Sequence, residues 1–260
     1  MVAFDVSADA YGRFMGRYSE PLAVRFAGLV DPRRGQRALD VGCGPGALAA
    51  ELVRRLGPDA VCAVDPSEAF VAAARERLDG VDVRAAAAER LPFADATFDV
   101  TFAQLVVHFM GDPVAGLREM ARVTRPAGVV AACVWDHAGD GGPLSLFWRA
   151  ARDLDPEAPD ESGLAGAREG HLRELFELAG LRDPEPTTLS VRVTHPTFEQ
   201  WWEPFLLGVG PAGEYVAGLG PRRRDELRER CRRLLSSPPI RVDATAWTVR
   251  AHPPPAAGSR

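Results

Sequence analysis

Lysine is absent from this chain of 260 residues, and all 31 basic residues are arginine. The absence excludes enzymes that form a Schiff base through a lysine side chain, pyridoxal phosphate enzymes included. The net charge is −5, and the only block of basic residues is Arg222-Arg223-Arg224. Because nucleic-acid-binding proteins usually carry a basic patch, we expect no nucleic-acid partner.

Long apolar runs are missing as well. No stretch of about 18 apolar residues occurs, and the N-terminus has no apolar signal core. We therefore expect a cytoplasmic protein with no membrane partner. The cysteines Cys43, Cys62, Cys133 and Cys231 are scattered without a C-x-x-C pair. Their spacing predicts neither a metal site nor a disulfide framework.

The organising stretch of the chain runs from residue 37 to residue 56. An apolar segment through Val41 reads as a strand, three glycines interrupt it, and a helix continues to Leu56. This is the first strand, turn and helix of an open α/β sheet, with its turn at the strand's carboxyl end. Ligands of such sheets bind at that edge, so the glycine turn predicts a ligand site.

The spacing Gly42-x-Gly44-x-x-Ala47 fits the dinucleotide-binding fingerprint, which makes an NAD(P)-dependent oxidoreductase one reading. Asp40 counts against it, because a carboxylate beside the ligand repels a pyrophosphate and attracts an ammonium or sulfonium group.

Two segments resemble one family. Residues 39–46, Leu-Asp-Val-Gly-Cys-Gly-Pro-Gly, resemble motif I of the class I S-adenosylmethionine-dependent methyltransferases. Leu91-Pro92-Phe93 followed by Phe98-Asp99 resembles a segment of the small-molecule, ubiquinone/menaquinone-methyltransferase-like type. The resemblance implies a doubly wound, Rossmann-like α/β fold with a seven-stranded, mainly parallel sheet whose last two strands pair antiparallel. It also implies S-adenosyl-L-methionine as cofactor and S-adenosyl-L-homocysteine as product.

The resemblance assigns cofactor contacts along the sheet edge. Asp40 is expected near the amino group of the cofactor, and Asp65 either binds the ribose hydroxyls or caps the next helix. Ala87 stands where the family often has an aspartate for adenine, which leaves the base to Ala88 and Glu89. The other implied contacts are Gly42, Cys43, Gly44, Gly46, Pro66, Gln104 and Leu105.

Further candidates come from the flanking segments. Tyr11 and Arg17 are expected to contact the cofactor, with Arg17 binding the cofactor's carboxylate. The alternative is that Tyr11 packs in the core and Arg17 is a surface charge. His108 is the candidate catalytic base, although a structural histidine, or positioning without a base, fits equally. Asp136 and His137 are secondary candidates for acceptor contacts.

The predicted domain is a single unit of 1–260. Within it we expect an N-terminal helical lid at 1–30, cap insertions at 136–166 and 195–238, and a disordered tail at 252–260. Two tryptophans and Phe205 in the second insertion either line an acceptor pocket or pack the insertion to the sheet. The sequence thus predicts methyl transfer to a small-molecule acceptor. Besides the oxidoreductase reading, a non-catalytic protein that binds S-adenosylmethionine remains an alternative.

Overall fold

A seven-stranded sheet forms the centre of the computed structural model, which describes residues 8–159, 161–235 and 237–255. The strand order is β3-β2-β1-β4-β5-β7-β6; β7 is antiparallel to both of its neighbours, and the other pairs are parallel. The predicted doubly wound fold is therefore confirmed. The strands are β1 Ala38–Val41, β2 Val61–Asp65, β3 Asp82–Ala85, β4 Phe98–Gln104, β5 Thr124–Trp135, β6 Arg182–His195 and β7 Ile240–His252.

Helices cover both faces of the sheet. Successive strand residues point to opposite sides, so each strand places apolar side chains on both faces, and helices bury them. Ala38 and Phe102 pack with Phe26 on one face, whereas Leu39 packs with Leu117 on the other. The first face carries α2 Arg17–Val30, α3 Ala47–Leu56 and α4 Glu68–Arg77; the second carries α5 Pro113–Val123 and α7 His171–Leu178.

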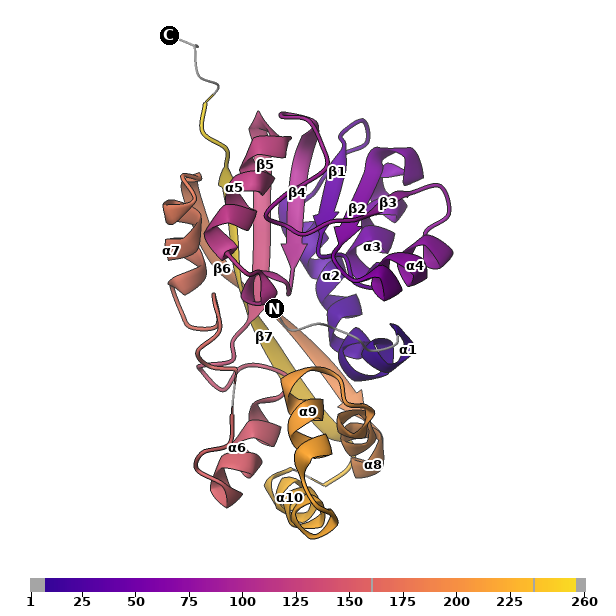
Figure 1. The fold of residues 1–260 in the computed structure, drawn as a ribbon, viewed down its shortest axis with the longest axis vertical. Helices are drawn as coiled ribbons and strands as arrows, with labels where there is room; N and C mark the ends of the chain where they lie inside the picture. The colour runs from indigo at the N-terminus through magenta and orange to yellow at the C-terminus, as the bar shows by residue number, and fades with distance from the viewer. Residues whose placement is uncertain (1–7, 160, 236, 256–260) are drawn as a thin grey trace.

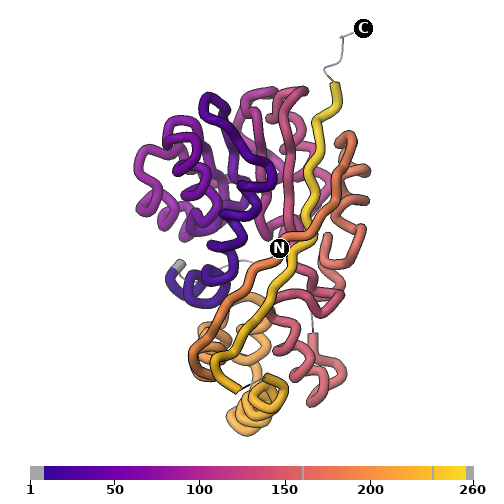
Figure 2. Tube along the Cα trace, turned by 180° about the vertical axis from the view of Figure 1, so that it is seen from behind, coloured from indigo at the N-terminus to yellow at the C-terminus, as the bar shows by residue number. Residues whose placement is uncertain are grey.

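The last two strands extend well beyond the rest of the sheet (Figure 1). They run side by side as a long ribbon, orange and yellow in Figure 2, and a group of helices gathers at its far end. These helices, the helical cap, are α6 Ser145–Leu154, α8 Phe198–Trp202, η4 Glu203–Leu207, α9 Gly210–Gly218 and α10 Pro221–Leu234. Phe147 and Phe205 stack with ring centroids 4.5 Å apart, and Trp201 lies 4.9 Å from Phe205. These rings form the core of the cap, so packing is the role that the structure shows for them.

The two ends of the chain differ from the prediction. The N-terminal helical segment consists of α1 Ala8–Tyr11, a π-helical turn η1 Gly12–Gly16, and α2, which begins at Arg17 rather than near Glu20. His252, assigned to a disordered tail, ends β7, and its Nδ1 lies 2.8 Å from the carbonyl oxygen of Gly128. Residues 256–260 of that predicted tail lie outside the described residues.

Residues 125–128, Arg-Pro-Ala-Gly, contain a proline and a glycine, which favour a turn, yet they belong to β5. The register between β4 and β5 shifts between Phe98 and Val100, which accommodates the extra residues as a bulge. Gly128 fits there because a Cβ atom would lie 2.4 Å from the carbonyl oxygen of Asp99. Within the described ranges, no helix has the length and apolarity needed to cross a membrane.

Candidate functional site

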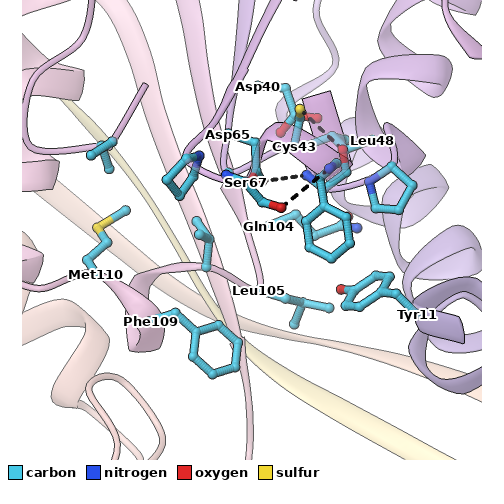
Figure 3. A pocket seen from close by; sticks show the side chains of 18 of the residues that line it. Tyr11, Asp40, Cys43, Leu48, Asp65, Ser67, Gln104, Leu105, Phe109 and Met110 are labelled. Carbon is cyan, nitrogen blue, oxygen red and sulfur yellow. Dashed lines mark hydrogen bonds between the residues drawn. The ribbon is translucent and has the colours of Figure 1, made fainter. Parts of the chain in front are cut away.

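A cavity of about 490 Å³ lies where β1, β2 and β4 end (Figure 3). It occupies the sheet edge that the glycine turn predicted. Of the predicted cofactor residues, eleven line it: Tyr11, Asp40, Gly42, Cys43, Gly44, Asp65, Pro66, Ala88, Glu89, Gln104 and Leu105. The sequence therefore located the cavity, although which group each residue binds is a separate question.

The glycine turn brings backbone close to the end of β4. Gly42 has φ of 69°, and a Cβ atom there would lie 2.2 Å from Cγ2 of Val106. Gly46 does not line the cavity; with φ of 87°, its Cα lies against the Leu78 side chain, which a Cβ atom would approach to 2.8 Å. Gly46 therefore shapes the turn into α3 rather than the wall of the cavity.

Asp40 is a buried carboxyl group facing this cavity. Only 1% of the residue is exposed, and its Oδ2 atom has no hydrogen-bond partner among the described residues. Burial raises its pKa to about 7; the backbone hydrogen bond from Ala49 opposes this rise, and the charge of Asp65 adds to it. A buried polar atom without a partner is costly, so a cationic group in the cavity would satisfy it.

Asp65 joins the glycine turn to α4. Its Oδ2 accepts a hydrogen bond from the Gly44 backbone N–H at 2.8 Å, and its Oδ1 accepts one from Ser67 N–H at 2.9 Å. Burial raises the pKa of Asp65, and these two bonds oppose the rise. Ser67 itself is the N-cap of α4 and accepts from Phe70 N–H. Asp65 thus braces the turn before α4, whereas Ser67 rather than Asp65 caps that helix, and Asp65 also lines the cavity.

The N-terminal segment contributes one of its two predicted residues. Tyr11 lines the cavity, and its ring packs edge-on against Phe70 at a centroid distance of 5.3 Å. Arg17 lies outside the cavity lining, and its guanidinium donates to His195 Nδ1 at 2.9 Å and to the Gln200 carbonyl oxygen at 3.1 Å. The structure directs the Arg17 side chain away from the cavity, toward β6 and α8, and its contact with the cofactor's carboxylate stays a prediction of the sequence alone.

Sequence reasoning missed Phe70 and Ser67, which both line the cavity. A signal was available: Ser67 follows Asp65-Pro66 at a helix start, and Phe70 is the first large apolar residue of that helix. Side chains in a first helical turn after such a strand reach the ligand edge of the sheet.

A smaller cavity of about 40 Å³ adjoins the first and shares Tyr11, Leu105 and Phe109 with it. His108 and His137 line this second cavity. Burial lowers the pKa of His108 well below its ordinary value, and the nearby His137 acts in the same direction, so the imidazole is neutral.

Leu105 separates the two cavities in a strained backbone conformation. Its φ is 61°, and its N–H donates to the Cys133 carbonyl oxygen at 2.9 Å. A left-handed conformation costs a residue with a Cβ atom about 1 kcal/mol or more, and such strain is often found at functional sites.

Asp136, the other acceptor candidate, does not line either cavity. Its Oδ1 atom accepts from Gly139 N–H at 2.8 Å and from Trp247 Nε1–H at 3.2 Å. It therefore organises the loop after β5. No group of three potential metal ligands occurs within the part of the chain that the structure describes.

The fold and the cavity define an α/β protein with a candidate ligand site at the carboxyl edge of its sheet. Residues 39–132 match a family model described as a methyltransferase domain. The chain is 33% identical over 129 residues to the malonyl-[acyl-carrier protein] O-methyltransferase of Serratia marcescens, covering 47% of this chain and 50% of that protein. It is 37% identical over 111 residues to the ubiquinone/menaquinone biosynthesis C-methyltransferase UbiE of Bdellovibrio bacteriovorus, covering 41% and 46%.

A solved structure shares the fold. It is a phosphoethanolamine N-methyltransferase of Haemonchus contortus in complex with S-adenosylhomocysteine, at a TM-score of 0.58 and 18% identity, covering 98% of this chain and 61% of that one. The chain spans about half the length of the two curated relatives. Residues 39–132 are thus similar to a methyltransferase domain, and the chain shares its fold with a solved methyltransferase.

Proposed function

We propose that the protein is an enzyme that transfers a methyl group from S-adenosylmethionine to a small-molecule acceptor. When bound, this cofactor supplies a methyl group that its sulfonium centre has already activated. The observation that carries the proposal is Asp40, which lines the larger cavity and whose buried Oδ2 atom has no hydrogen-bond partner among the described residues. A carboxylate there suits the ammonium group of the cofactor and repels the pyrophosphate of a dinucleotide.

The remaining contacts follow from the lining of the cavity. Asp65 retains lone pairs for the ribose hydroxyls beyond the two backbone bonds that it accepts. Ala88 and Glu89 hold the base, and Gln104 and Leu105 border the methionine part. The Oε1 atom of Gln104 is buried without a partner in the described structure, which leaves it free to accept from the ligand.

The chain's own contribution to the reaction is positioning and exclusion of water. We infer that the segment 1–30, of which residues 1–7 lie outside the described ranges, acts as a lid, since Tyr11 lines the cavity and packs against Phe70. The insertions 136–166 and 195–238 shape the acceptor side, because His137, Glu161 and Val209 from these insertions line the smaller cavity. A small molecule suits this arrangement better than a macromolecule, since the site is a concave cavity with a mostly apolar lining.

The test combines binding with turnover. Asp40→Asn keeps the shape of the side chain and removes its charge, so it should weaken S-adenosylhomocysteine binding about tenfold or more, as loss of a charged hydrogen bond does. Asp59→Asn, the same change at an exposed carboxylate, is the matched control. Methyl transfer from labelled S-adenosylmethionine is then measured over a panel of small acceptors. Equal affinities of the two variants, or no transfer to any acceptor, would contradict the proposal.

A further inference from the structure

Two side chains that line the smaller cavity each carry a buried polar atom that the cofactor contacts do not use. His108 is 8% exposed and Trp135 is 2% exposed, and both line this cavity. Neither His108 Nδ1 nor Trp135 Nε1 has a hydrogen-bond partner among the described residues. Buried polar groups in folded proteins almost always have partners, so two such atoms on side chains that line one small cavity indicate a ligand group that satisfies them.

We propose that the smaller cavity binds a neutral hydroxyl group of the methyl acceptor, with Trp135 Nε1 donating to its oxygen and His108 Nδ1 accepting its proton. This inference rests on the proposed function, which it deepens by naming the acceptor's chemical class. His108 is then a positioning residue for the acceptor's O–H, and Trp135 is a further specificity-determining residue.

The hydrogen-bonding capacity of the pair selects the hydroxyl. An indole N–H only donates, whereas a neutral imidazole with its proton on Nε2 accepts at Nδ1. A hydroxyl group offers one donor and two acceptor positions, so it satisfies both atoms. An ammonium group only donates and leaves the Trp135 N–H unpaired, and a carboxylate only accepts and leaves His108 Nδ1 unpaired.

The surrounding charge counts against a carboxylate in particular. Glu161 is 4% exposed and lines the same cavity; its Oε2 accepts from Trp148 Nε1 at 2.9 Å and lies 3.8 Å from His137 Nδ1. A second carboxylate brought into this space would be repelled and would lose its hydration.

The size of the cavity limits what enters it. A volume of about 40 Å³ admits the polar end of an acceptor and not its whole body. The other lining side chains include Phe14, Met15 and Leu144, which are apolar. The apolar body of the acceptor therefore extends past Leu105 and Phe109, the residues shared with the larger cavity, and this places the hydroxyl end beside the cofactor site.

The experiment uses three probes with the same ring and different polar ends: benzyl alcohol, benzylamine and benzoate. Each is titrated at neutral pH into the full chain, with and without saturating S-adenosylhomocysteine, while the tryptophan indole N–H resonances are recorded by NMR. The chain has five tryptophans, and the Trp135→Phe variant identifies the Trp135 signal. Benzyl alcohol should move that signal saturably and bind at least tenfold more tightly than the charged probes.

Matched variants separate the hydroxyl contacts from general packing. Trp135→Phe should weaken benzyl alcohol binding about three- to tenfold, as loss of one hydrogen bond does. Trp202→Phe makes the same change in the core of the cap, away from the cavity, and should leave the affinity unchanged. His108→Leu should weaken binding similarly, whereas His108→Asn should preserve it, because the asparagine oxygen can accept near the position of Nδ1.

The result that overturns the inference is equal affinity for the three probes, or equal effects of the two tryptophan variants. Either would mean that His108 and Trp135 do not select a hydroxyl group. The calorimetric heat of S-adenosylhomocysteine binding keeps this failure apart from that of the proposed function. Cofactor binding without hydroxyl selectivity refutes only the acceptor class, whereas absent cofactor binding refutes the function.

Discussion

Binding of S-adenosylhomocysteine should release a proton from Asp40. The unliganded carboxyl has a pKa of about 7 because it is buried, so it carries its proton over much of the acidic to neutral range. The ammonium group of the ligand favours the ionised form. Binding below pH 7 therefore requires deprotonation, and the dissociation constant should be about tenfold larger at pH 6 than at pH 8.

The assay is isothermal titration calorimetry at pH 6, 7 and 8 in buffers of different ionisation enthalpy, which reports the number of protons released. The wild type and Asp59→Asn should show the dependence, and Asp40→Asn should bind weakly with little change between pH 6 and pH 8.

The raised pKa also has a consequence for folding. The unfolded carboxyl ionises at its ordinary value of 3.8, so the ligand-free protein should lose stability as the pH rises from 4 through 7. If the stability of the wild type and that of Asp40→Asn depended on pH in the same way, the raised pKa of Asp40 would be refuted.

Three further perturbations follow from the described contacts. Gly42→Ala should lower the free energy of unfolding by about 3 kcal/mol in urea titrations, since its Cβ would lie 2.2 Å from Val106. Gly16→Ala is the control, because a Cβ atom there meets nothing within 4 Å; an equal loss of stability in both variants would be inconsistent with this packing. The pKa of His195 is lowered to about 4 by burial and by Arg17, so between pH 6.5 and pH 4 the unfolded state binds a proton that the folded state does not, and the protein should lose stability as the pH falls through that range. His195→Gln should make the melting temperature less dependent on pH there, and an unchanged dependence would show that His195 is not its source. Arg17→Gln should change the affinity for S-adenosylhomocysteine by no more than about twofold, because Arg17 bonds to His195 and Gln200 outside the cavity. A large loss of affinity in calorimetry would show that Arg17 contacts the ligand.

Local signals were sufficient for the core of the fold. The helix after Asp112-Pro113 begins where its sequence indicates, since Asp112 accepts from Ala115 N–H and Pro113 occupies the first helical position. The strand Phe98–Gln104 is a largely apolar run, as the buried centre of a parallel sheet requires. Both elements depend on short-range chemistry that the sequence displays directly.

Long-range pairing explains what the sequence did not show. Pro184 and Pro186 argue against a strand, yet they lie in β6, which is an edge strand of the sheet and tolerates a missing N–H. Helix α9 was missed because it contains three glycines, although Pro211 near its start suits a first helical turn.

The residues of the site also fall into those that local sequence indicates and those that depend on distant partners. Asp40 and the glycines were predictable because they lie within one motif, whereas the observed contacts of Arg17 were not, because its partners, His195 and Gln200, are distant in sequence. Glu161 and Trp135 reach the smaller cavity from separate segments, and no local pattern marks either of them.

The most direct test of the central claim is calorimetric titration of the purified protein with S-adenosylhomocysteine and, separately, with NADH. The account predicts saturable one-to-one binding of S-adenosylhomocysteine and none of NADH, because the unpartnered Asp40 carboxylate accepts an ammonium group and repels a pyrophosphate. Binding of NADH alone would contradict the account and assign the cavity to a dinucleotide.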